Sequence, residues 1–451
     1  RLYLHHHCCC IMGDFCIITV SCLLQNRNIF IRILVKDVQH QRMTYFGIIH
    51  QQCFLQWNHL LLFILLNLDS LISALHNFIA LAYAAKIKLY QAYQQDEITH
   101  AVTSINKELL REVVSLCDQV TASNRYGLLD DFQGLDLVAN ENGKESVFAI
   151  QYSMNDGTES AGRINWSNLL NSPGGGSPYG GDGFFLPSQD LINAYQTDAN
   201  GLPDFNYQSK SDYSWAVLNN GVYTLQNTTP NVDPRLDFVV GRPTITWKTY
   251  PDKPCEGWVR DKETYGYNCA KRFWVSPESS DMFNGWPWGA SQLNWQIIRY
   301  ADILLWKAEA LIELNEGNGL ETARDLINQI RNRARNSAYV KDFNDHSKYA
   351  ANYLVNPYPA DVWNQDYARQ ALRWETRLEK ALEGERFFDL VRWGIVETTM
   401  NKYITAESDN RIYYANAHFT GGKDEYYPVP NNQYGFSGGK YVQNPGYAPF
   451  N

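Results

Sequence analysis

The chain has 451 residues, enough to bury a large core in one big domain or in two smaller ones. Its formal net charge of −9 argues against the basic surface that nucleic-acid binding requires, so we expect no nucleic-acid partner. Aromatic residues make up 14% of the chain, which suits either large aromatic cores or flat surfaces that stack on ligands. The chain has no run of about 18 or more apolar residues, so the sequence predicts no membrane-spanning helix.

The first 80 residues differ in composition from the rest of the chain. They hold six of the nine cysteines and seven of the ten histidines, and they contain neither Glu nor Pro. Three interpretations are open: a His/Cys metal tract, a lipoprotein signal ending at Cys22, or incorrect residue identities in this stretch. Adjacent cysteines are poor ligands for a tetrahedral metal and Asp14 interrupts the apolar part of a signal, so we favour the third. We base no function on this segment and expect residues 1–70 to belong to a helical scaffold.

Amphipathic periodicity predicts helices from residue 71 onward. One helix spans 71–93 and a second spans 104–123. A helical hairpin is expected at 294–335 with its turn at 315–319, and small residues at the crossing make it similar to a tetratricopeptide unit. Because isolated hairpins cannot bury their apolar faces, the helical parts are expected to stack into one scaffold. That scaffold would comprise residues 71–123 and 294–400.

The region between these helical parts, about 164–290, is predicted to be rich in loops and turns, and a short strand at 145–152 precedes it. The run SPGGGSPYGGDGFF (172–185) holds six glycines. It lacks the Lys-Ser/Thr ending and the following helix of a phosphate loop, so we reject a nucleotide site. Cys255 and Cys269 either pair or stay free, and their spacing leaves both possibilities open.

Residues 372–394 carry like charges at helical spacing, with Gly384 separating two helical pieces. Arg373 and Arg377 lie four apart, as do Glu375 and Glu379. Same-sign pairs at that spacing destabilise an isolated helix by roughly 0.2–0.5 kcal/mol each. They are tolerable where each row of charge meets an opposite row, or backbone carbonyls, on a neighbouring element. The alternative is an ordinary charged surface helix.

Five motifs follow one another in order over the C-terminal half of the chain. They are DPRL (233–236), RYADILLWKAEALIELNEG with INQIRNRA (299–317 and 327–334), the stretch 372–394, YPVPNNQ (427–433) and QNPGY (443–447). In type and order they resemble the SusD/RagB family of outer-membrane nutrient-binding lipoproteins of Bacteroidota. Within the third motif the family pattern falls on Arg373, Glu375, Arg377, Glu383, Gly384, Arg386, Phe388, Asp389, Leu390, Arg392, Trp393 and Gly394. Glu379-Lys380-Ala381-Leu382 departs from it.

The resemblance implies a mostly α fold with tetratricopeptide-like helix pairs and a large loop-rich, ligand-facing region that carries a few short strands. The family-like domain would cover residues 71–451, and its last part, 401–451, would close on the scaffold. It also implies capture of oligosaccharides at the cell surface and delivery to a SusC-like TonB-dependent barrel transporter, with this chain as the lid. A peptide-binding lid of the RagB type is the alternative. An N-terminal lipid in the outer membrane is implied by the family, although no lipid-bearing Cys is identifiable in the sequence.

The ligand-binding residues have to be inferred separately, because the family motifs imply structural roles for Arg373, Glu375, Arg377, Glu383, Arg386, Asp389, Arg392 and Trp393. Sugars present apolar faces rimmed by hydroxyls, so their sites combine exposed aromatic rings with polar groups. The loop-rich region supplies such rings in the glycine run, in NYQSKSDYSW (206–215) and in MFNGWPWG (282–289). As a group, we expect ligand binding by Tyr179, Tyr213, Trp215, Trp286 and Trp288. Packing against the scaffold is the alternative for each of them.

Other classes of function fit the sequence less well. A glycosidase needs two carboxylates that flank a cleft, whereas Asp302 and Glu309 lie nearly two turns apart on one predicted helix. Only His346 and His418 occur after His100, which leaves no plausible Ser-His-Asp arrangement. A pure tetratricopeptide adaptor would leave the aromatic, glycine-rich middle without a purpose. We therefore expect no enzymatic activity, no metal and no cofactor.

Overall fold

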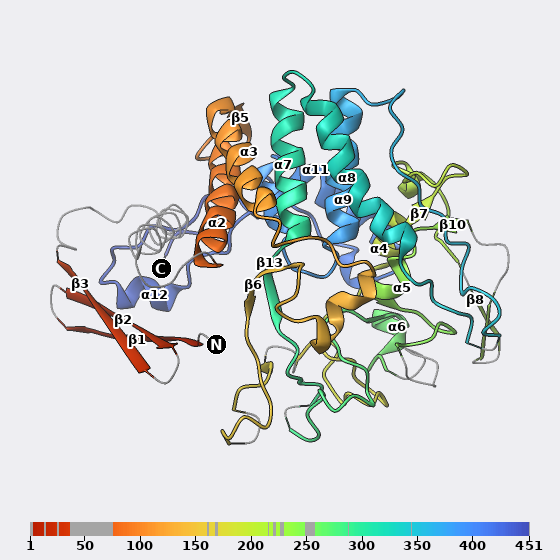
Figure 1. The fold of residues 1–451 in the computed structure, drawn as a ribbon, viewed down its shortest axis with the longest axis horizontal. Coiled ribbons are helices and arrows are strands. Elements are labelled where there is room, and N and C mark those ends of the chain that lie inside the picture. The colour runs from red at the N-terminus through yellow and green to blue at the C-terminus, as the bar shows by residue number, and fades with distance from the viewer. Residues whose placement is uncertain are drawn as a thin grey trace. The chain divides into compact units, whose positions relative to one another are not determined.

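The computed structural model describes two compact units, residues Arg1–Gln56 with Tyr426–Asn451 and residues Trp57–Glu425, and each is treated by itself (Figure 1). The residues that it describes are 3–12, 15–24, 27–36, 75–159, 162–166, 170–214, 216–219, 222–225, 230–248, 258–286, 288–343 and 345–450. The extent of the domain that the sequence predicted, 71–451, stays a prediction.

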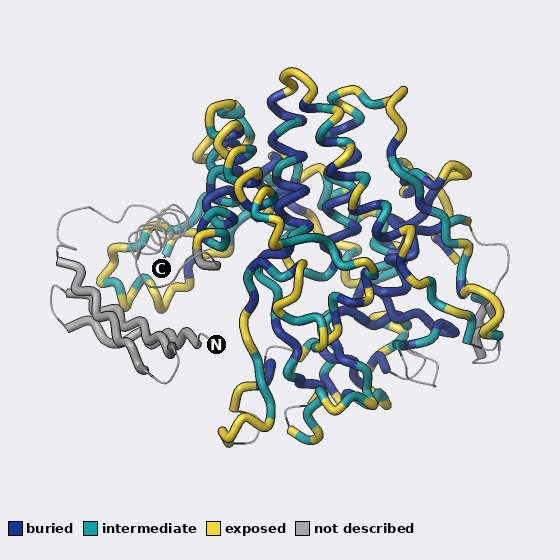
Figure 2. The backbone as a smooth tube through the Cα atoms, viewed as in Figure 1, coloured by how far each residue is buried: buried dark blue, intermediate teal, exposed yellow. Residues whose placement is uncertain are grey.

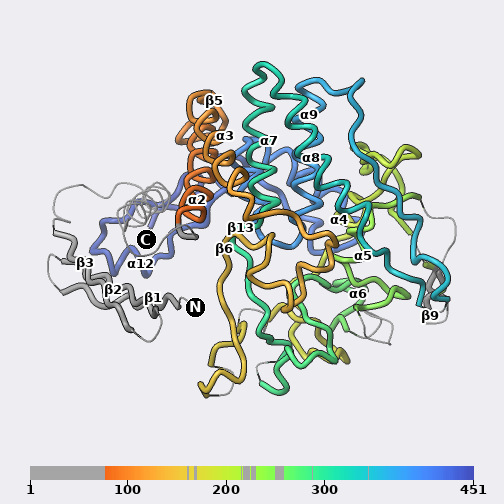
Figure 3. Tube along the Cα trace, viewed as in Figure 1, coloured from red at the N-terminus to blue at the C-terminus, as the bar shows by residue number. Residues whose placement is uncertain are grey.

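The larger unit contains a scaffold of antiparallel helix pairs, which confirms the mostly α fold class. Helix α7 packs against α3, α8 and α9, and α2 packs against α3, as the traces in Figures 1 and 3 show. The scaffold helices are α2 (Leu75–Ala92), α3 (Lys107–Ala122), α7 (Tyr300–Leu314), α8 (Gly319–Asn336), α9 (Gln365–Glu379), α10 (Arg386–Arg392) and α11 (Val396–Ser408).

Helix α7 is central because it is apolar almost all round, as a buried helix must be. Ile303, Trp306 and Ala310 pack with α2, α3 and the α10 region. Leu304 and Ala308 pack on another side with α8 and α9. Figure 2 shows α7 buried along most of its length.

The predicted helix boundaries hold in outline, with one difference at the start of the hairpin. Residues Trp295–Arg299 form a strand, β13, which pairs antiparallel with β6 (Ser146–Ile150). The β-branched pair Ile297-Ile298 favours extended backbone, and the partner strand lies far away in the sequence. The predicted break near Gly384 is confirmed: α9 ends at Glu379, α10 begins at Arg386, and Gly384 has a φ of +85°.

The region between α3 and β13 is made of loops and very short elements, as the sequence predicted. Its strands pair two by two: β7 (Gln196–Thr197) with β10 (Asn231–Val232), β11 (Val240–Gly241) with β12 (Cys269–Ala270), and β8 (Ala216–Asn219) with β9 (Val222–Leu225). Its short helices are η1 (Phe132–Asp136), η2 (Val138–Asn140), α4 (Gln189–Ala194), η4 (Tyr207–Ser209), α5 (Leu236–Val239) and α6 (Lys262–Tyr265). Elsewhere in this unit, β4 (Tyr93–Gln95) pairs with β5 (Val102–Ile105), and η5 (Ile412–Tyr414) follows α11.

The smaller unit departs from the prediction that residues 1–70 belong to a helical scaffold. Three consecutive strands, β1 (Tyr3–Met12), β2 (Phe15–Leu24) and β3 (Arg27–Lys36), form an antiparallel sheet. The β-branched residues that fill β2 and β3 favour strands over helices. A short helix, α12 (Asn431–Phe436), lies in the C-terminal part of this unit.

The structure describes two cysteines of the larger unit, Cys117 and Cys269, and they differ in oxidation state. Cys117 is a buried free thiol on α3, and burial raises its pKa. Cys269 is disulfide-bonded. Cys255 lies outside the described residues, so whether it is the partner of Cys269 stays open, as the sequence left it.

Candidate functional site

Buried aromatic rings hold the glycine-rich loop in place. The Tyr179 hydroxyl donates to the Val275 carbonyl at 2.7 Å and accepts from Trp247 Nε1 at 2.9 Å. The rings of Trp247, Trp258 and Trp274 surround it. Only 1% of Tyr179 is exposed. Tyr179 therefore fixes the loop and offers no face to a ligand, contrary to the sequence-based hypothesis.

A second loop, residues 282–291, lies against the glycine loop. Its base closes by an antiparallel bridge between Met282 and Ser291. Gly289 approaches the glycine loop so closely that a Cβ added there would lie 2.5 Å from the Ser172 Cβ. The Trp288 side chain lies beside Gly180, where an added Cβ would be 3.6 Å from the Trp288 Cγ. The described parts of the two loops are thus packed closely against each other.

This pairing of loops exposes two of the predicted residues. Trp286 is 61% exposed and Trp288 is 49% exposed. A large apolar ring in water costs free energy unless something covers it, so exposed tryptophans on a fixed loop are candidates for ligand contact. Ligand binding by these two residues stays a prediction.

Two further aromatic residues are exposed that the sequence did not lead us to predict as ligand-binding, Trp166 and Phe184. Trp166 is 45% exposed and follows Asn165, whose backbone N–H donates to the Ser291 carbonyl at 2.9 Å, at the base of the 282–291 loop. Phe184 is 70% exposed at the end of the glycine run. The pair Phe184-Phe185 directly after glycines was a usable signal for an exposed ring. We call Trp166, Phe184, Trp286 and Trp288 the aromatic loop surface.

The remaining two predicted residues do not join this surface. Tyr213 is 2% exposed, its backbone N–H donates to Asn193 Oδ1 at 2.8 Å, and the Arg242 guanidinium lies 5.6 Å from its ring centroid. Its burial contradicts a role as an exposed platform. Trp215 lies outside the described residues. Of the predicted group of five, Trp286 and Trp288 are exposed, Tyr179 and Tyr213 are buried, and Trp215 stays a prediction.

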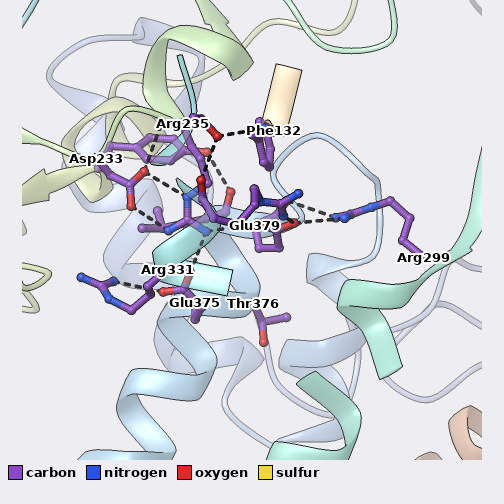
Figure 4. A network of polar contacts seen from close by, with 12 residues as sticks. Phe132, Asp233, Arg235, Arg299, Arg331, Glu375, Thr376 and Glu379 are labelled. Atoms are coloured by element: carbon purple, nitrogen blue, oxygen red, sulfur yellow. Dashed lines mark hydrogen bonds and ion pairs between the residues drawn. The ribbon is translucent and has the colours of Figure 1, made fainter. Parts of the chain in front are cut away.

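Glu375 and Glu379 of α9 form ion pairs with arginines of neighbouring elements (Figure 4). Glu375 accepts from Arg235 at 2.6 Å and from Arg331 at 3.1 Å, and all three side chains are fully buried. Glu379 accepts from Arg299 at 3.0 Å and from Arg235 at 3.2 Å. Arg235 belongs to the loop-rich region, so these contacts tie that region to the helical scaffold.

The cations around Glu379 change its titration. Burial alone would raise the pKa of this carboxyl, but Arg333, Arg299 and Arg235 outweigh burial and lower the pKa to about 2. Glu383 also belongs to this cluster, accepting from Arg299 Nη2 at 2.7 Å. Arg377 lies on another side of α9 and pairs with Asp190 at 2.5 Å.

Arg392 of α10 pairs with Glu309 of α7. Glu309 accepts from Arg392, from Trp393 Nε1 at 2.8 Å and from the Tyr93 hydroxyl at 2.6 Å. Asp389 accepts from Arg392 at 2.9 Å. The pKa of Asp389 is raised, and burial is the largest cause. The positive charge of Arg392 offsets part of that rise.

Two arginines of the motif, Arg373 and Arg386, lie near the Trp393 ring, and Arg386 also donates to a backbone carbonyl. Arg386 donates to the Arg373 carbonyl at 3.1 Å, and both guanidinium groups lie within about 6 Å of the Trp393 ring, a cation–π distance. The motif residues thus occupy contacts between helices.

The carboxylates that a hydrolase would use are engaged elsewhere. Asp302 pairs with Lys380 and accepts from the Arg299 backbone N–H, while Glu309 is held by Arg392. Across the described ranges, no group of three or more His, Cys, Asp or Glu side chains could hold a metal ion. In the same part of the chain, no helix is both long and apolar enough to cross a bilayer.

Comparison with known proteins identifies the relatives of this fold. The model of the SusD family matches residues 144–447. Among solved structures, the chain is similar to a SusD superfamily protein from Bacteroides vulgatus (21% identity, TM-score 0.53) and to a SusD homolog from Bacteroides thetaiotaomicron (16%, 0.53). It is also similar to surface glycan-binding protein A from Bacteroides fluxus (19%, 0.51).

Each of these three alignments covers 82% of this chain. They cover 62%, 64% and 62% of the respective solved chains, so this chain spans less than two thirds of their length. No curated protein sequence matches. At these identities the solved structures establish the fold.

Proposed function

The chain belongs to the SusD family, and we propose that it captures oligosaccharides at the cell surface for a SusC-like TonB-dependent outer-membrane transporter, on which it acts as the lid. The observation that carries the proposal is the exposure of Trp286 and Trp288 on a loop that packs closely against the glycine loop. Flat rings of this kind stack on the apolar faces of sugar rings.

Two further observations support this proposal. One protein of similar fold is named a surface glycan-binding protein. Side chains with hydrogen-bonding groups lie beside the loops, among them Asp182, which pairs with the half-exposed Arg260. A preformed site of this type loses little conformational entropy on binding. The proposal includes attachment to the outer membrane through an N-terminal lipid and no hydrolytic activity.

Tryptophan fluorescence tests the binding step directly. Neutral glycan oligomers should quench and shift the emission of the wild-type protein in a saturable way, whereas peptides of similar size should not. Saturable quenching by peptides alone would favour the peptide-binding alternative and overturn the choice of ligand.

The partnership needs a separate test. An affinity-tagged chain expressed in its native membrane should co-purify with a large outer-membrane barrel after mild detergent extraction. A protein that is extracted without any barrel would contradict the role as a lid while leaving glycan binding intact.

A further inference from the structure

A polar cavity of about 270 Å³ lies in the larger unit, and its lining includes none of the residues of the aromatic loop surface. Residues of α4, of the segment that contains and follows η4, and of the end of α11 line it. At roughly 30 Å³ per water molecule it would hold about nine waters, which is room for one monosaccharide ring. We call it the α4–α11 pocket. Its principal lining residues are Asp190, Asn193, Gln208, Asp212, Glu407 and Asn410.

Glu407 is the feature that points to a ligand. Its side chain is 1% exposed, and one of its carboxylate oxygens accepts the backbone N–H of Asp190. Among the residues that the structure describes, no cation forms an ion pair with Glu407 and no donor bonds its second oxygen. Burial, and to a smaller extent the Asp190 carboxylate, raises the pKa of Glu407. A buried carboxylate without a counter-ion is costly, and such groups are ordinarily paired.

The other charges of the lining leave the pocket negative. Asp190 is neutralised by Arg377. Within the described part of the chain, Asp212 accepts from two amides, Asn193 at 2.7 Å and Asn410 at 3.2 Å. Lys210, the one basic residue of the lining, pairs with Asp204 outside it. Such a pocket repels an anionic ligand and attracts a cation.

Arg411 lies near Glu407, but within the described contacts its guanidinium forms no ion pair with the Glu407 carboxylate. Its guanidinium donates to the Asn410 carbonyl at 2.6 Å, and it lies against Gly266, where an added Cβ would nearly coincide with the Arg411 Nη2. Arg411 therefore partly offsets the charge of Glu407 at a distance, and Glu407 is one of the residues that line the cavity.

Exposed tyrosine rings follow directly along the chain from this pocket. The Arg411 backbone N–H donates to the Glu407 carbonyl at 2.8 Å, and the chain then leads to Tyr413, which is 50% exposed. Tyr265 is 45% exposed, with its ring centroid 6.0 Å from that of Tyr413. Aromatic faces attract ammonium groups and also stack on sugar rings.

We propose that the α4–α11 pocket binds an amino sugar, with its ammonium group at Glu407 and its ring hydroxyls on the amides of Asn193, Gln208 and Asn410. The ammonium supplies the missing counter-charge. Each amide has two N–H groups, of which Asn193 and Asn410 give one to Asp212 and Gln208 gives one to Asp190, so that among the described contacts a second N–H of each is left for a hydroxyl group. This site is separate from the aromatic loop surface, so it stands or falls independently of the function proposed above.

Calorimetric or NMR titration with three matched monosaccharides tests this proposal. Glucosamine carries the ammonium, glucose has a hydroxyl in its place, and N-acetylglucosamine has the nitrogen without the charge. We expect glucosamine to bind at least about tenfold more tightly than either of the others, since it alone compensates the buried carboxylate. Equal affinities for all three, or no binding of glucosamine, would overturn the proposal. Binding of glycylglycine as tight as that of glucosamine would overturn the assignment to a sugar.

Variants then locate the site. Glu407→Gln should weaken glucosamine binding by at least about tenfold. Because Glu407 is buried and its variant could fail to fold, the exposed Asp409→Asn on the pocket rim serves as a second variant, with a smaller loss of several-fold expected. Glu397→Gln removes the same charge from the other end of α11 and should leave binding unchanged, as should Trp286→Ala. Equal losses in Asp409→Asn and Glu397→Gln would show that net charge alone is responsible and contradict the site.

Discussion

Arg235 and Glu375 form an ion pair of 2.6 Å in which neither side chain is exposed to solvent. The two residues lie 140 positions apart, one in the loop-rich region and the other on α9. Arg235 also pairs with Glu379 and with Asp233, so one guanidinium joins three carboxylates. Such a cluster contributes little net stability compared with an apolar core, but removing one member leaves buried charge without a partner. We infer that the cluster fixes where the loops sit on the scaffold.

Removing one carboxylate of this cluster should destabilise the protein strongly. Glu379→Gln takes the charge away from Arg235, Arg299 and Arg333 together. A broken buried pair of this kind costs about 3–5 kcal/mol. Chemical denaturation followed by circular dichroism measures the loss. The matched control is Glu316→Gln, which breaks the exposed pair with Arg111 and should change little. Equal effects of the two variants would show that burial of the cluster does not matter.

The same carboxyl predicts acid sensitivity. The pKa of Glu379 is about 2 in the folded chain, against an ordinary value of 4.5, because the surrounding guanidinium groups outweigh the effect of burial. A depressed folded-state pKa gives stability that is fully present above about pH 4.5 and is lost as the pH falls toward 2. The unfolding midpoint should therefore drop across this window. In the Glu379→Gln variant the unfolding midpoint should fall less steeply with pH than in the wild type. A variant whose midpoint falls as steeply as that of the wild type would assign the acid sensitivity to other groups, such as Glu385.

Loss of the exposed tryptophans should weaken glycan binding without unfolding the protein. Trp286→Ala and Trp288→Ala each remove a stacking face worth on the order of 1 kcal/mol, which corresponds to about a fivefold loss of affinity. Both side chains are about half exposed or more, so the unfolding midpoint should barely move. Titration of the most strongly quenching glycan measures both variants. Trp286→Phe keeps a flat ring and should recover part of the affinity; a Phe variant as weak as Ala would argue against stacking.

The local pattern of the sequence was enough to predict the helical scaffold, but not which aromatic residues of the loops are buried. Apolar spacing gave the hairpin of α7 and α8 and the break before α10, because periodicity and Gly384 act within a few residues. Burial of Tyr179 was not predictable, since its partners Trp247 and Val275 lie some 70 to 100 residues further along the chain. A tyrosine among glycines looks exposed until such partners are known. The exposure of Trp286 and Trp288 was predictable because turn residues surround them in the sequence.

Close packing between the two loops predicts a coupled effect on stability and binding. Gly289 has a φ of +72°, and a Cβ there would lie 2.5 Å from the Ser172 Cβ and Oγ. Gly289→Ala should therefore cost about 1 kcal/mol for the left-handed backbone and a further 1–3 kcal/mol for the clash. The clash would push the 282–291 loop from the glycine loop and displace Trp288, so glycan affinity should fall as well.

Gly157→Ala is the matched control for this variant. Gly157 has a φ of +86°, but no atom lies within 4 Å of an added Cβ. It should lose about 1 kcal/mol from backbone strain and keep its glycan affinity. Denaturant unfolding and fluorescence titration of the two variants separate strain from displacement. Full glycan affinity in a folded Gly289→Ala protein would show that the position of Trp288 does not depend on contact between the loops.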